Sequence, residues 1–223
     1  MGLHKVACIF GPDGAGKSTL INFLYALLSS TKGRVLVVKI GTNHMPARII
    51  ENLFTMLGYY VWRPNSKCRM QKRIPRWLLK RKCIRFLWSL ANFAGSLTAI
   101  LLYVYIKCFK YGFILVEDFI PRIIADYVYA LERHVRNYKP LMSIFLSILL
   151  SICPKCIYLS ADYETLKARR GSCVEPRDYV EIQIAVYNIL IKFLAQQCDS
   201  IIINTSKTNK YETLRIALRF MEK

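Results

Sequence analysis

The sequence predicts an α/β protein, a doubly wound parallel sheet of five strands with helices on both faces and a small lid. Short apolar runs alternate with helix-forming segments along the chain, which is typical of parallel βαβ units. The first apolar run leads through a glycine-rich loop straight into a helix. With 223 residues, the chain has room for one such domain, burying roughly 70% of its unfolded surface, and none for a second.

Five apolar runs bounded by turn residues are the expected strands. They span 5–10, 34–40, 113–118, 155–161 and 200–206. The segments between and after them have helical periodicity. These span 17–30, 47–57, 86–106, 121–137, 140–153, 162–172, 175–197 and 210–223. Some helices carry their own start signals, because Pro121 suits a first helical turn and Asp162 is a favourable cap.

The stretch CIFGPDGAGKSTL, residues 8–20, fits the pattern G-x-x-x-x-G-K-[ST] of a phosphate-binding loop (P-loop). Its glycines let backbone N–H groups converge on phosphates, and the helix that follows adds its positive dipole end. Lys17 is expected to reach the β- and γ-phosphates, and the Ser18 hydroxyl to bind Mg²⁺. We therefore expect a P-loop NTPase fold with ATP and Mg²⁺ as cofactors. The nucleotide-binding residues are Gly11, Gly14, Gly16, Lys17, Ser18 and Thr19.

The loop variant GPDGAGKST resembles the thymidylate kinase family, whose pattern is G-x-D-G-x-G-K-[ST]. The stretch IYLSADYETLKARRGSCVEPRDYVEIQIAVYNIL resembles the family's strand, lid and following helix, and VKIGTNHMPARIIENLF is similar to archaeal thymidylate kinase-like proteins. The resemblance covers most of the chain. It implies one kinase-like domain over 1–223, with a lid at about 168–180 and a basic insert at about 60–85 that the family lacks. The implied activity is transfer of the ATP γ-phosphate to dTMP or a related nucleoside monophosphate.

The resemblance also suggests catalytic roles for particular residues. Asp13 would approach the acceptor or the γ-phosphate, and Arg169 or Arg170 would close over the transferring phosphate as a lid cation. Family members follow the third strand with Asp-Arg-Tyr or Glu-Arg-Tyr, whose arginine contacts the acceptor phosphate. That arginine is missing here, and Arg122 is the nearest replacement.

Two adjacent carboxylates, Glu117 and Asp118, end the third strand in place of that motif. With Ser18 they suit magnesium or its water shell, although capping of the next helix is an alternative. The acceptor pocket is less defined. His44 is either a hydrogen-bonding loop residue or a catalyst, and a group of aromatic residues either stacks a base or belongs to the core. This group is Tyr127, Tyr129 and Tyr179.

The charge is strongly one-sided, with 33 Lys and Arg against 14 Asp and Glu, a formal net charge of +19. Ten of the basic residues lie in the segment 63–85. Such a field attracts nucleic acid or an anionic membrane surface, or it simply belongs to a solvated insertion. The alternative function is therefore a catalytically diverged P-loop nucleotide-binding protein whose basic surface binds one of these polyanions.

The segment 86–106 has 21 residues without a charge, long enough to cross a membrane. A span there would separate the P-loop from the third strand, so we expect a long buried helix instead. The eight cysteines are expected to be reduced in a cytoplasmic protein, and the pair Cys153 and Cys156 to be structural rather than metal-binding. A nucleoside monophosphate is the expected small-molecule partner, and a homodimer is a further candidate assembly.

Overall fold

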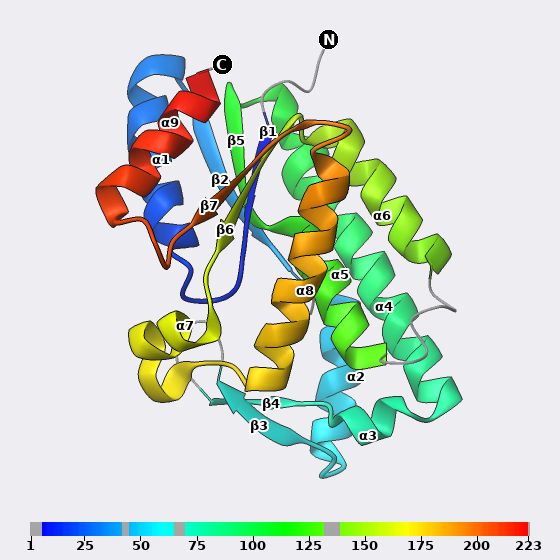
Figure 1. Ribbon diagram of the computed structural model, residues 1–223. Coiled ribbons are helices and arrows are strands. Elements are labelled where there is room, and N and C mark those ends of the chain that lie inside the picture. Colours follow the sequence, from blue (N-terminus) through cyan, green and yellow to red (C-terminus); the bar gives the residue numbers. More distant parts are fainter. Residues whose placement is uncertain (1–5, 42–44, 65–69, 132–138, 223) are drawn as a thin grey trace.

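The computed structural model describes residues 6–41, 45–64, 70–131 and 139–222. Its main sheet has five parallel strands in the order β2-β5-β1-β6-β7 (Figure 1). The strands are β1 (Val6–Phe10), β2 (Val35–Ile40), β5 (Phe113–Asp118), β6 (Lys155–Ser160) and β7 (Asp199–Asn204). The predicted doubly wound α/β fold is therefore confirmed, with each strand within two residues of its expected bounds.

Helices cover both faces of this sheet. Figure 1 shows α1 (Lys17–Lys32) and α9 (Lys210–Glu222) on one face, and a larger group of helices on the other. That group consists of α4 (Lys82–Ile100), α5 (Phe119–Leu131), α6 (Lys139–Ile152) and α8 (Arg177–Leu194). Each face buries its own apolar cluster, so the central strand β1 is buried at every position. Burial on both sides explains why its sequence is apolar without alternation.

The region predicted to form the lid contains one short helix and one turn. The helix α7 (Tyr163–Arg170) follows β6, and the 3₁₀ turn η4 (Gly171–Cys173) leads from it towards α8. Asp162 caps α7 as expected, because its Oδ1 accepts a hydrogen bond from the Thr165 amide at 2.7 Å. This cap fixes the start of the helix that carries the two candidate lid arginines.

The basic insert has its own secondary structure. After α2 (Met45–Met56), the hairpin strands β3 (Val61–Pro64) and β4 (Met70–Arg73) pair antiparallel and lead into the short helix α3 (Arg76–Leu79). Buried apolar residues anchor the end of the insert to the core, so it is not merely a solvated insertion. These residues are Ile74, Leu78 and Leu79.

The long apolar helix differs from expectation. It begins at Lys82, earlier than predicted, and continues past α4 through the π-helical turn η1 (Leu101–Tyr105) and the 3₁₀ turn η2 (Lys107–Phe109). Only one side of it is buried, against β2, α5 and α2. The expectation of a buried helix is therefore wrong for its outer side, where large apolar residues are exposed.

Six of the described cysteines have free thiols, as expected, and one does not. The thiols of Cys8, Cys83, Cys108, Cys153, Cys156 and Cys198 are free. Burial raises the pKa of the Cys153 thiol well above its usual range, which suits a structural role. The expectation of reduced thiols is wrong for Cys173, which the structure places in a disulfide bond just after α7.

Candidate functional site

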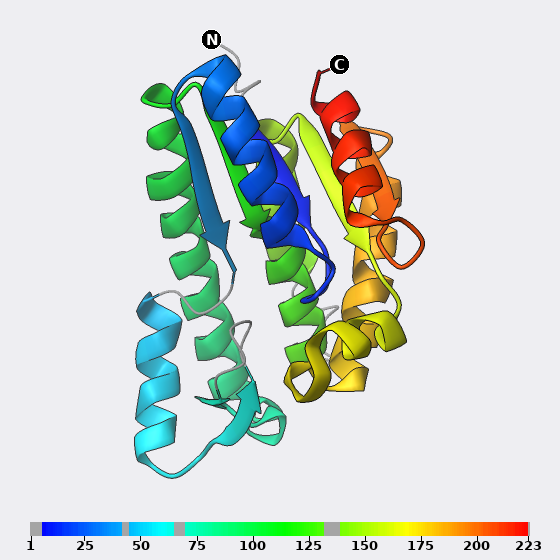
Figure 2. The same ribbon diagram turned by 90° about the vertical axis from the view of Figure 1, so that its left-hand side faces the viewer.

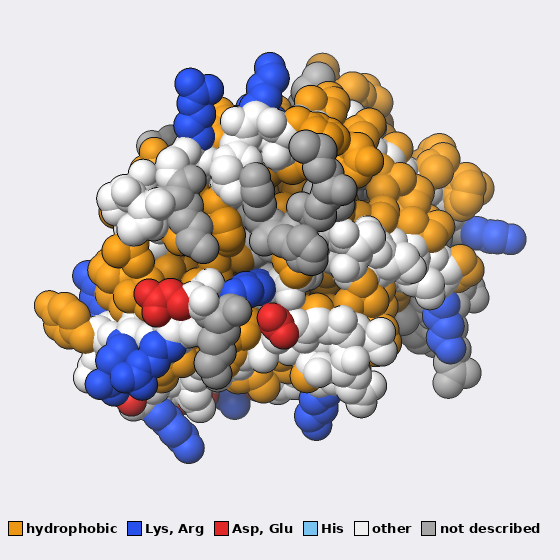
Figure 3. All heavy atoms as spheres, turned by 90° about the horizontal axis from the view of Figure 1, so that it is seen from above, with side chains coloured by type: hydrophobic (Ala, Val, Ile, Leu, Met, Phe, Trp, Pro, Cys, Tyr) orange, Lys and Arg blue, Asp and Glu red, His pale blue; other side chains and the backbone are white. Residues whose placement is uncertain are grey.

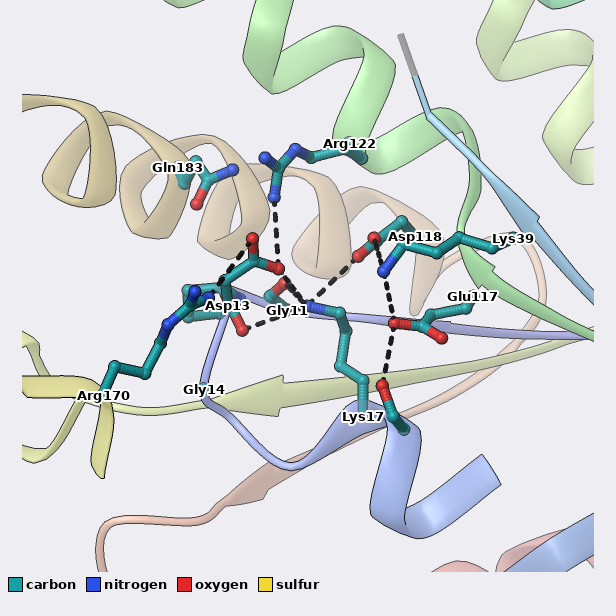
Figure 4. Close-up of polar contacts among 12 residues, drawn as sticks. Gly11, Asp13, Gly14, Lys17, Lys39, Glu117, Asp118, Arg122, Arg170 and Gln183 are labelled. Carbon is teal, nitrogen blue, oxygen red and sulfur yellow. Dashed lines mark hydrogen bonds and ion pairs between the residues drawn. The ribbon is translucent and has the colours of Figure 1, made fainter. Parts of the chain in front are cut away.

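The candidate site lies where parallel strands end at the carboxyl edge of the sheet, the usual position of ligand sites in such folds. The loop between β1 and α1 runs through this edge, and Figure 4 shows Lys17 at its centre. The Lys17 Nζ donates hydrogen bonds to the carbonyl oxygens of Gly11 at 2.8 Å and Pro12 at 3.1 Å. It also lies 3.1 Å from Asp13 Oδ1 and 3.2 Å from Asp118 Oδ1. The single charge of a side chain that is 4% exposed is thus shared between the loop and β5.

Close packing against β6 requires glycine at the first position of the loop. Gly11 has φ +155°, and a Cβ there would meet the carbonyl oxygen of Leu159 in β6 at 2.3 Å. At the other end of the loop, Gly16 lies in the left-handed region with φ +95° and caps α1. The chain can therefore turn from strand to helix only with glycine at these positions.

Asp13 is the focus of the positive charge around the loop. Its Oδ1 lies 3.6 Å from Arg122 Nη1 and its Oδ2 3.6 Å from Arg170 Nη1, in addition to the contact with Lys17. Burial disfavours its ionised form, but Lys17, Arg122 and Lys39 outweigh burial and hold the pKa of this carboxyl well below its usual range. Asp13 is therefore a buried anion beside the P-loop, and the side chains of Lys17, Arg122 and Arg170 converge on it.

The end of β5 brings both predicted carboxylates to the loop. Ser18 donates a hydrogen bond to Glu117 Oε1 at 3.2 Å, while Asp118 faces Lys17. Asp118 and Phe119 both have left-handed backbone conformations, with φ of 69° and 48°. Such angles cost of order 1–3 kcal/mol each, and surrounding structure must hold them in place. Here Phe119 is fully buried, which anchors the turn that aims Asp118 back at the loop.

A lysine that the sequence analysis did not single out completes this group. Lys39 Nζ, near the end of β2, lies 2.7 Å from Glu117 Oε1 and 3.2 Å from Asp118 Oδ2. Burial tends to lower the pKa of this ammonium, but Asp118 and Glu117 outweigh it and raise the pKa. β2 and β5 are neighbours in the sheet, with Lys39 opposite Glu117. The one feature of the sequence that could have pointed to Lys39 is that it is a charged residue near the end of an otherwise apolar strand.

The donor set suits magnesium in part. Ser18 Oγ and Glu117 Oε1 are hard oxygen ligands on the same side of the loop, and Mg²⁺ is usually held by one or two protein oxygens plus phosphates and water. Asp118 is less suited to direct coordination, because its oxygens face Lys17 and Lys39. In the described ranges, no group of three or more His, Cys, Asp or Glu side chains is arranged so that it could hold a metal ion.

Arg122 is held by a polar network beside the loop. Its Nε lies 3.3 Å from Asp126 Oδ1, and its guanidinium lies over the ring of Tyr179 with 5.4 Å to the centroid. In the amide orientation that satisfies its neighbours, Gln183 accepts a hydrogen bond from Arg122 Nη1 at 3.0 Å. Burial opposes its charge, but Tyr179, Asp126 and Asp13 together raise the pKa of Arg122 well above its usual value. The arginine is therefore fixed, charged and aimed at the loop (Figure 4).

The two lid arginines have different positions. Arg169 donates hydrogen bonds to the Thr205 carbonyl at 2.6 Å and to the Gly14 carbonyl at 3.3 Å, so it bridges the loop and the end of β7. Arg170 instead reaches Asp13, and Gly14 lies beneath it, since a Cβ there would meet Arg170 Cδ at 3.0 Å. The sequence could not separate these neighbours, and it gave no role to Thr205.

Two adjoining cavities surround the loop. One of about 280 Å³ is lined by charged residues, among them Asp13, Lys17, Glu117 and Arg170. The other, of about 320 Å³, lies towards β7 and α9 and is lined mainly by uncharged groups such as Thr205, Thr208 and Leu214. Both share Gly14, Gly16, Thr19 and Arg169. This arrangement fits phosphates in the first cavity and a nucleoside in the second.

Other aromatic candidates lie away from these cavities. Tyr127 is buried against α4, where its hydroxyl donates to the Ser89 carbonyl, and is part of the core. Tyr129 packs edge-on against Tyr179 and donates to Asp178 at 3.2 Å. Tyr179 contacts the site, because its ring lies under the guanidinium of Arg122. His44 lies outside the described residues.

Comparisons with known proteins agree with this geometry at the level of fold. The family model described as ABC transporter matches residues 2–72, which contain the P-loop. No curated protein matches the sequence. The crystal structure of thymidylate kinase from Ehrlichia chaffeensis matches with a TM-score of 0.58 and 12% sequence identity, covering 99% of this chain and 100% of that chain. Together they show a P-loop NTPase-like fold and support a nucleotide-binding P-loop protein.

Proposed function

We propose that this protein is a nucleotide kinase that transfers the ATP γ-phosphate to a nucleoside monophosphate, with dTMP the first candidate acceptor. The observation that carries the proposal is the convergence of Arg122 and Arg170 on Asp13. Nucleotide binding alone needs only the loop. Phosphoryl transfer also needs cations on both the donor and acceptor sides of the transferring group, because charge spreads over its oxygens in the transition state.

Each residue has a role in this proposal. Lys17 binds the β- and γ-phosphates, and Arg170 approaches the γ-phosphate from the lid. Arg122 binds the acceptor phosphate, replacing the arginine that the thymidylate kinase family carries immediately after this strand. Ser18 and Glu117 would hold Mg²⁺, which neutralises phosphate charge when bound.

The nucleoside of ATP fits the cavity lined by Thr205 and Leu214, beside Arg169. The volume of this cavity lies at the lower end of the range for typical ligand pockets. The helix α7, whose capped start follows β6 directly, fixes the main chain of both arginines. In this proposal the Arg169 guanidinium lies against the nucleoside, and Arg170 contacts the phosphates. The structural similarity to a thymidylate kinase supports this division of the site into donor and acceptor halves.

A second candidate is a diverged nucleotide-binding protein without an acceptor. Two observations favour it. Asp118 stands where the family has its arginine, and Lys39 pairs with both carboxylates that would assist the metal. This candidate binds ATP but does not turn it over in the presence of a monophosphate.

The deciding experiment measures ADP release with Mg²⁺ and ATP, alone and with each nucleoside monophosphate, and identifies the product by chromatography. The kinase requires one monophosphate to stimulate ADP release and to become its diphosphate. ATP binding by calorimetry, without stimulation by any monophosphate, would instead establish the diverged binder. The Lys17→Met variant is the control for turnover by a contaminating enzyme.

A further inference from the structure

The outer side of α4 is an unpartnered apolar surface. In the described part of the chain, one helix, Lys82–Phe109, is long and apolar enough to cross a membrane, and only 39% of its most apolar window is buried. At 1.5 Å per residue its 28 residues extend for about 42 Å. Soluble monomers rarely leave a continuous apolar surface of this length facing water.

Several of the exposed apolar residues follow helical spacing and form a stripe along the helix. We define this apolar stripe as Phe86, Leu87, Leu90, Ala94, Leu101, Leu102 and Tyr105. Phe86, Leu87 and Leu90 are each more than half exposed. α2, which packs against α4, also has exposed apolar residues in Ile49, Leu53 and Met56. Figure 3 looks down on the end of the molecule where α4 stops and shows a broad area of hydrophobic side chains with separate Lys and Arg side chains around it.

Positive charge is placed at both ends of the stripe. Lys80, Arg81 and Lys82 precede it and are exposed, and Lys107 and Lys110 follow it. Among the described residues, no ion pair joins these five cations to a carboxylate. The sequence has no Asp or Glu at all between Glu51 and Glu117. An occupant of this face must therefore be apolar in the middle and anionic at its margin.

The helix cannot cross a bilayer in this fold. Its inner side contributes Trp88, Ala99 and Val104 to the main apolar core, beside α5 and β2. Withdrawing α4 into lipid would expose that core. A helix that keeps one side on the protein and offers the other to lipid lies in the plane of the interface.

A second copy of the chain is a poor occupant. In a parallel pair each cationic end meets the same cationic end, and in an antiparallel pair Arg81 and Lys82 meet Lys107 and Lys110. Neither arrangement brings a carboxylate of this segment to the margin, and each chain carries a formal charge of +19. Like-charge contacts at both ends oppose the gain from burying the stripe.

We propose that the apolar stripe along α4 and η1 docks on an anionic lipid bilayer. The stripe lies at the boundary between headgroups and acyl chains, and the lysines and arginines at its ends contact lipid phosphates. Trp77, half-exposed on α3 just before α4, suits the headgroup region, where tryptophan is enriched. No residue of the stripe lines either cavity at the P-loop, so docking leaves the nucleotide site accessible.

The test is sedimentation of the protein with vesicles of phosphatidylcholine, with and without phosphatidylglycerol, at physiological ionic strength. We expect binding to the anionic vesicles. Phe86→Glu/Leu90→Glu should weaken it at least about ten-fold, because two apolar contacts are lost and two negative charges are added. Lys107→Gln/Lys110→Gln should weaken it by about five-fold per charge.

The matched control is Ile189→Glu/Phe193→Glu, two exposed apolar residues with the same spacing on α8. α8 lies on the same face of the sheet as α4 but is separated from it by α5, at the other edge of this layer in Figure 2, so these changes should leave vesicle binding unaltered. Circular dichroism and ATP binding show whether each variant is folded. Both readouts are independent of kinase activity.

Three outcomes would overturn the proposal. Binding of heparin or DNA equal to vesicle binding, and insensitive to Phe86→Glu/Leu90→Glu, would make the surface a general polyanion site. A dimer in analytical ultracentrifugation that these substitutions dissociate would make the stripe an interface between copies. Folded protein that binds no vesicles would show that the stripe has another occupant.

Discussion

Arg122 Nη1 lies 3.6 Å from Asp13 Oδ1, although Arg122 belongs to α5 and Asp13 to the loop after β1. The two side chains meet because β1 and β5 are parallel neighbours in the sheet. The loop that follows β1 and the helix that follows β5 therefore begin at the same edge of the sheet. The contact joins the half of the site that would hold ATP to the half that would hold an acceptor.

Arg122→Lys tests the acceptor half. Lysine keeps the charge but cannot reproduce the fork that contacts Asp13, Asp126 and Gln183. We expect kcat to fall at least about 100-fold while ATP affinity changes little. Initial rates with a saturating acceptor and calorimetry with ATP measure the two effects. Arg177→Lys, an exposed arginine paired with Glu181, is the matched control, and equal activity of both variants would remove Arg122 from the mechanism.

The two lid arginines should give different kinetic signatures. Arg170→Ala removes a cation beside Asp13 and should lower kcat by about 100-fold or more. Arg169→Ala removes the bridge between Thr205 and Gly14 beside the nucleoside cavity, so it should mainly raise the KM for ATP. Steady-state kinetics of both variants would separate these roles. A larger kcat loss in Arg169→Ala than in Arg170→Ala would reverse the assignment.

Asp13 should make stability depend on pH in the acid range. Although burial opposes ionisation, Lys17, Arg122 and Lys39 depress the pKa of Asp13 in the folded state below its ordinary value of 3.8. Its stabilising contribution is therefore full well above pH 4 and is lost as the pH falls below that. Urea unfolding at a series of pH values should show wild type and Asp13→Asn farthest apart above about pH 5 and converging in acid. Exposed Asp199→Asn is the control, and a constant gap would refute the linkage.

Gly11→Ala should destabilise the fold through a direct clash. The added Cβ would lie 2.3 Å from a backbone oxygen of β6, which cannot move without disturbing the sheet. We expect the free energy of unfolding to fall by about 3 kcal/mol or more. Gly58→Ala is the control for conformational strain alone, because its φ is +83° and a Cβ there meets nothing within 4 Å. Its cost should be about 1 kcal/mol. Equal losses in urea unfolding would argue against the clash.

Much of the fold and part of the site could be predicted from local sequence patterns. The P-loop pattern gave the loop, the start of α1 and the positions of Lys17 and Ser18, because strand, turn and helix are contiguous there. The sequence placed Glu117 and Asp118 at the end of a strand for the same reason. Lys39 and Thr205 were missed, since each joins the site only through the order of strands in the sheet.

Charge and hydrophobicity were also only partly informative. The uncharged segment 86–106 predicted a long helix, but the sequence did not show that one side of this helix faces outward. Similarly, Arg169 and Arg170 are adjacent and identical in type, and only the turn of α7 sends one to β7 and the other to Asp13.

What the sequence determined by itself is therefore the α/β fold, the phosphate loop and the excess of positive charge, since these depend on residue type and on neighbours along the chain. The tertiary structure alone decided which cations surround Asp13 and which side of α4 remains uncovered. Those features depend on contacts between segments far apart in sequence, and such contacts are set by strand order and packing rather than by any local pattern.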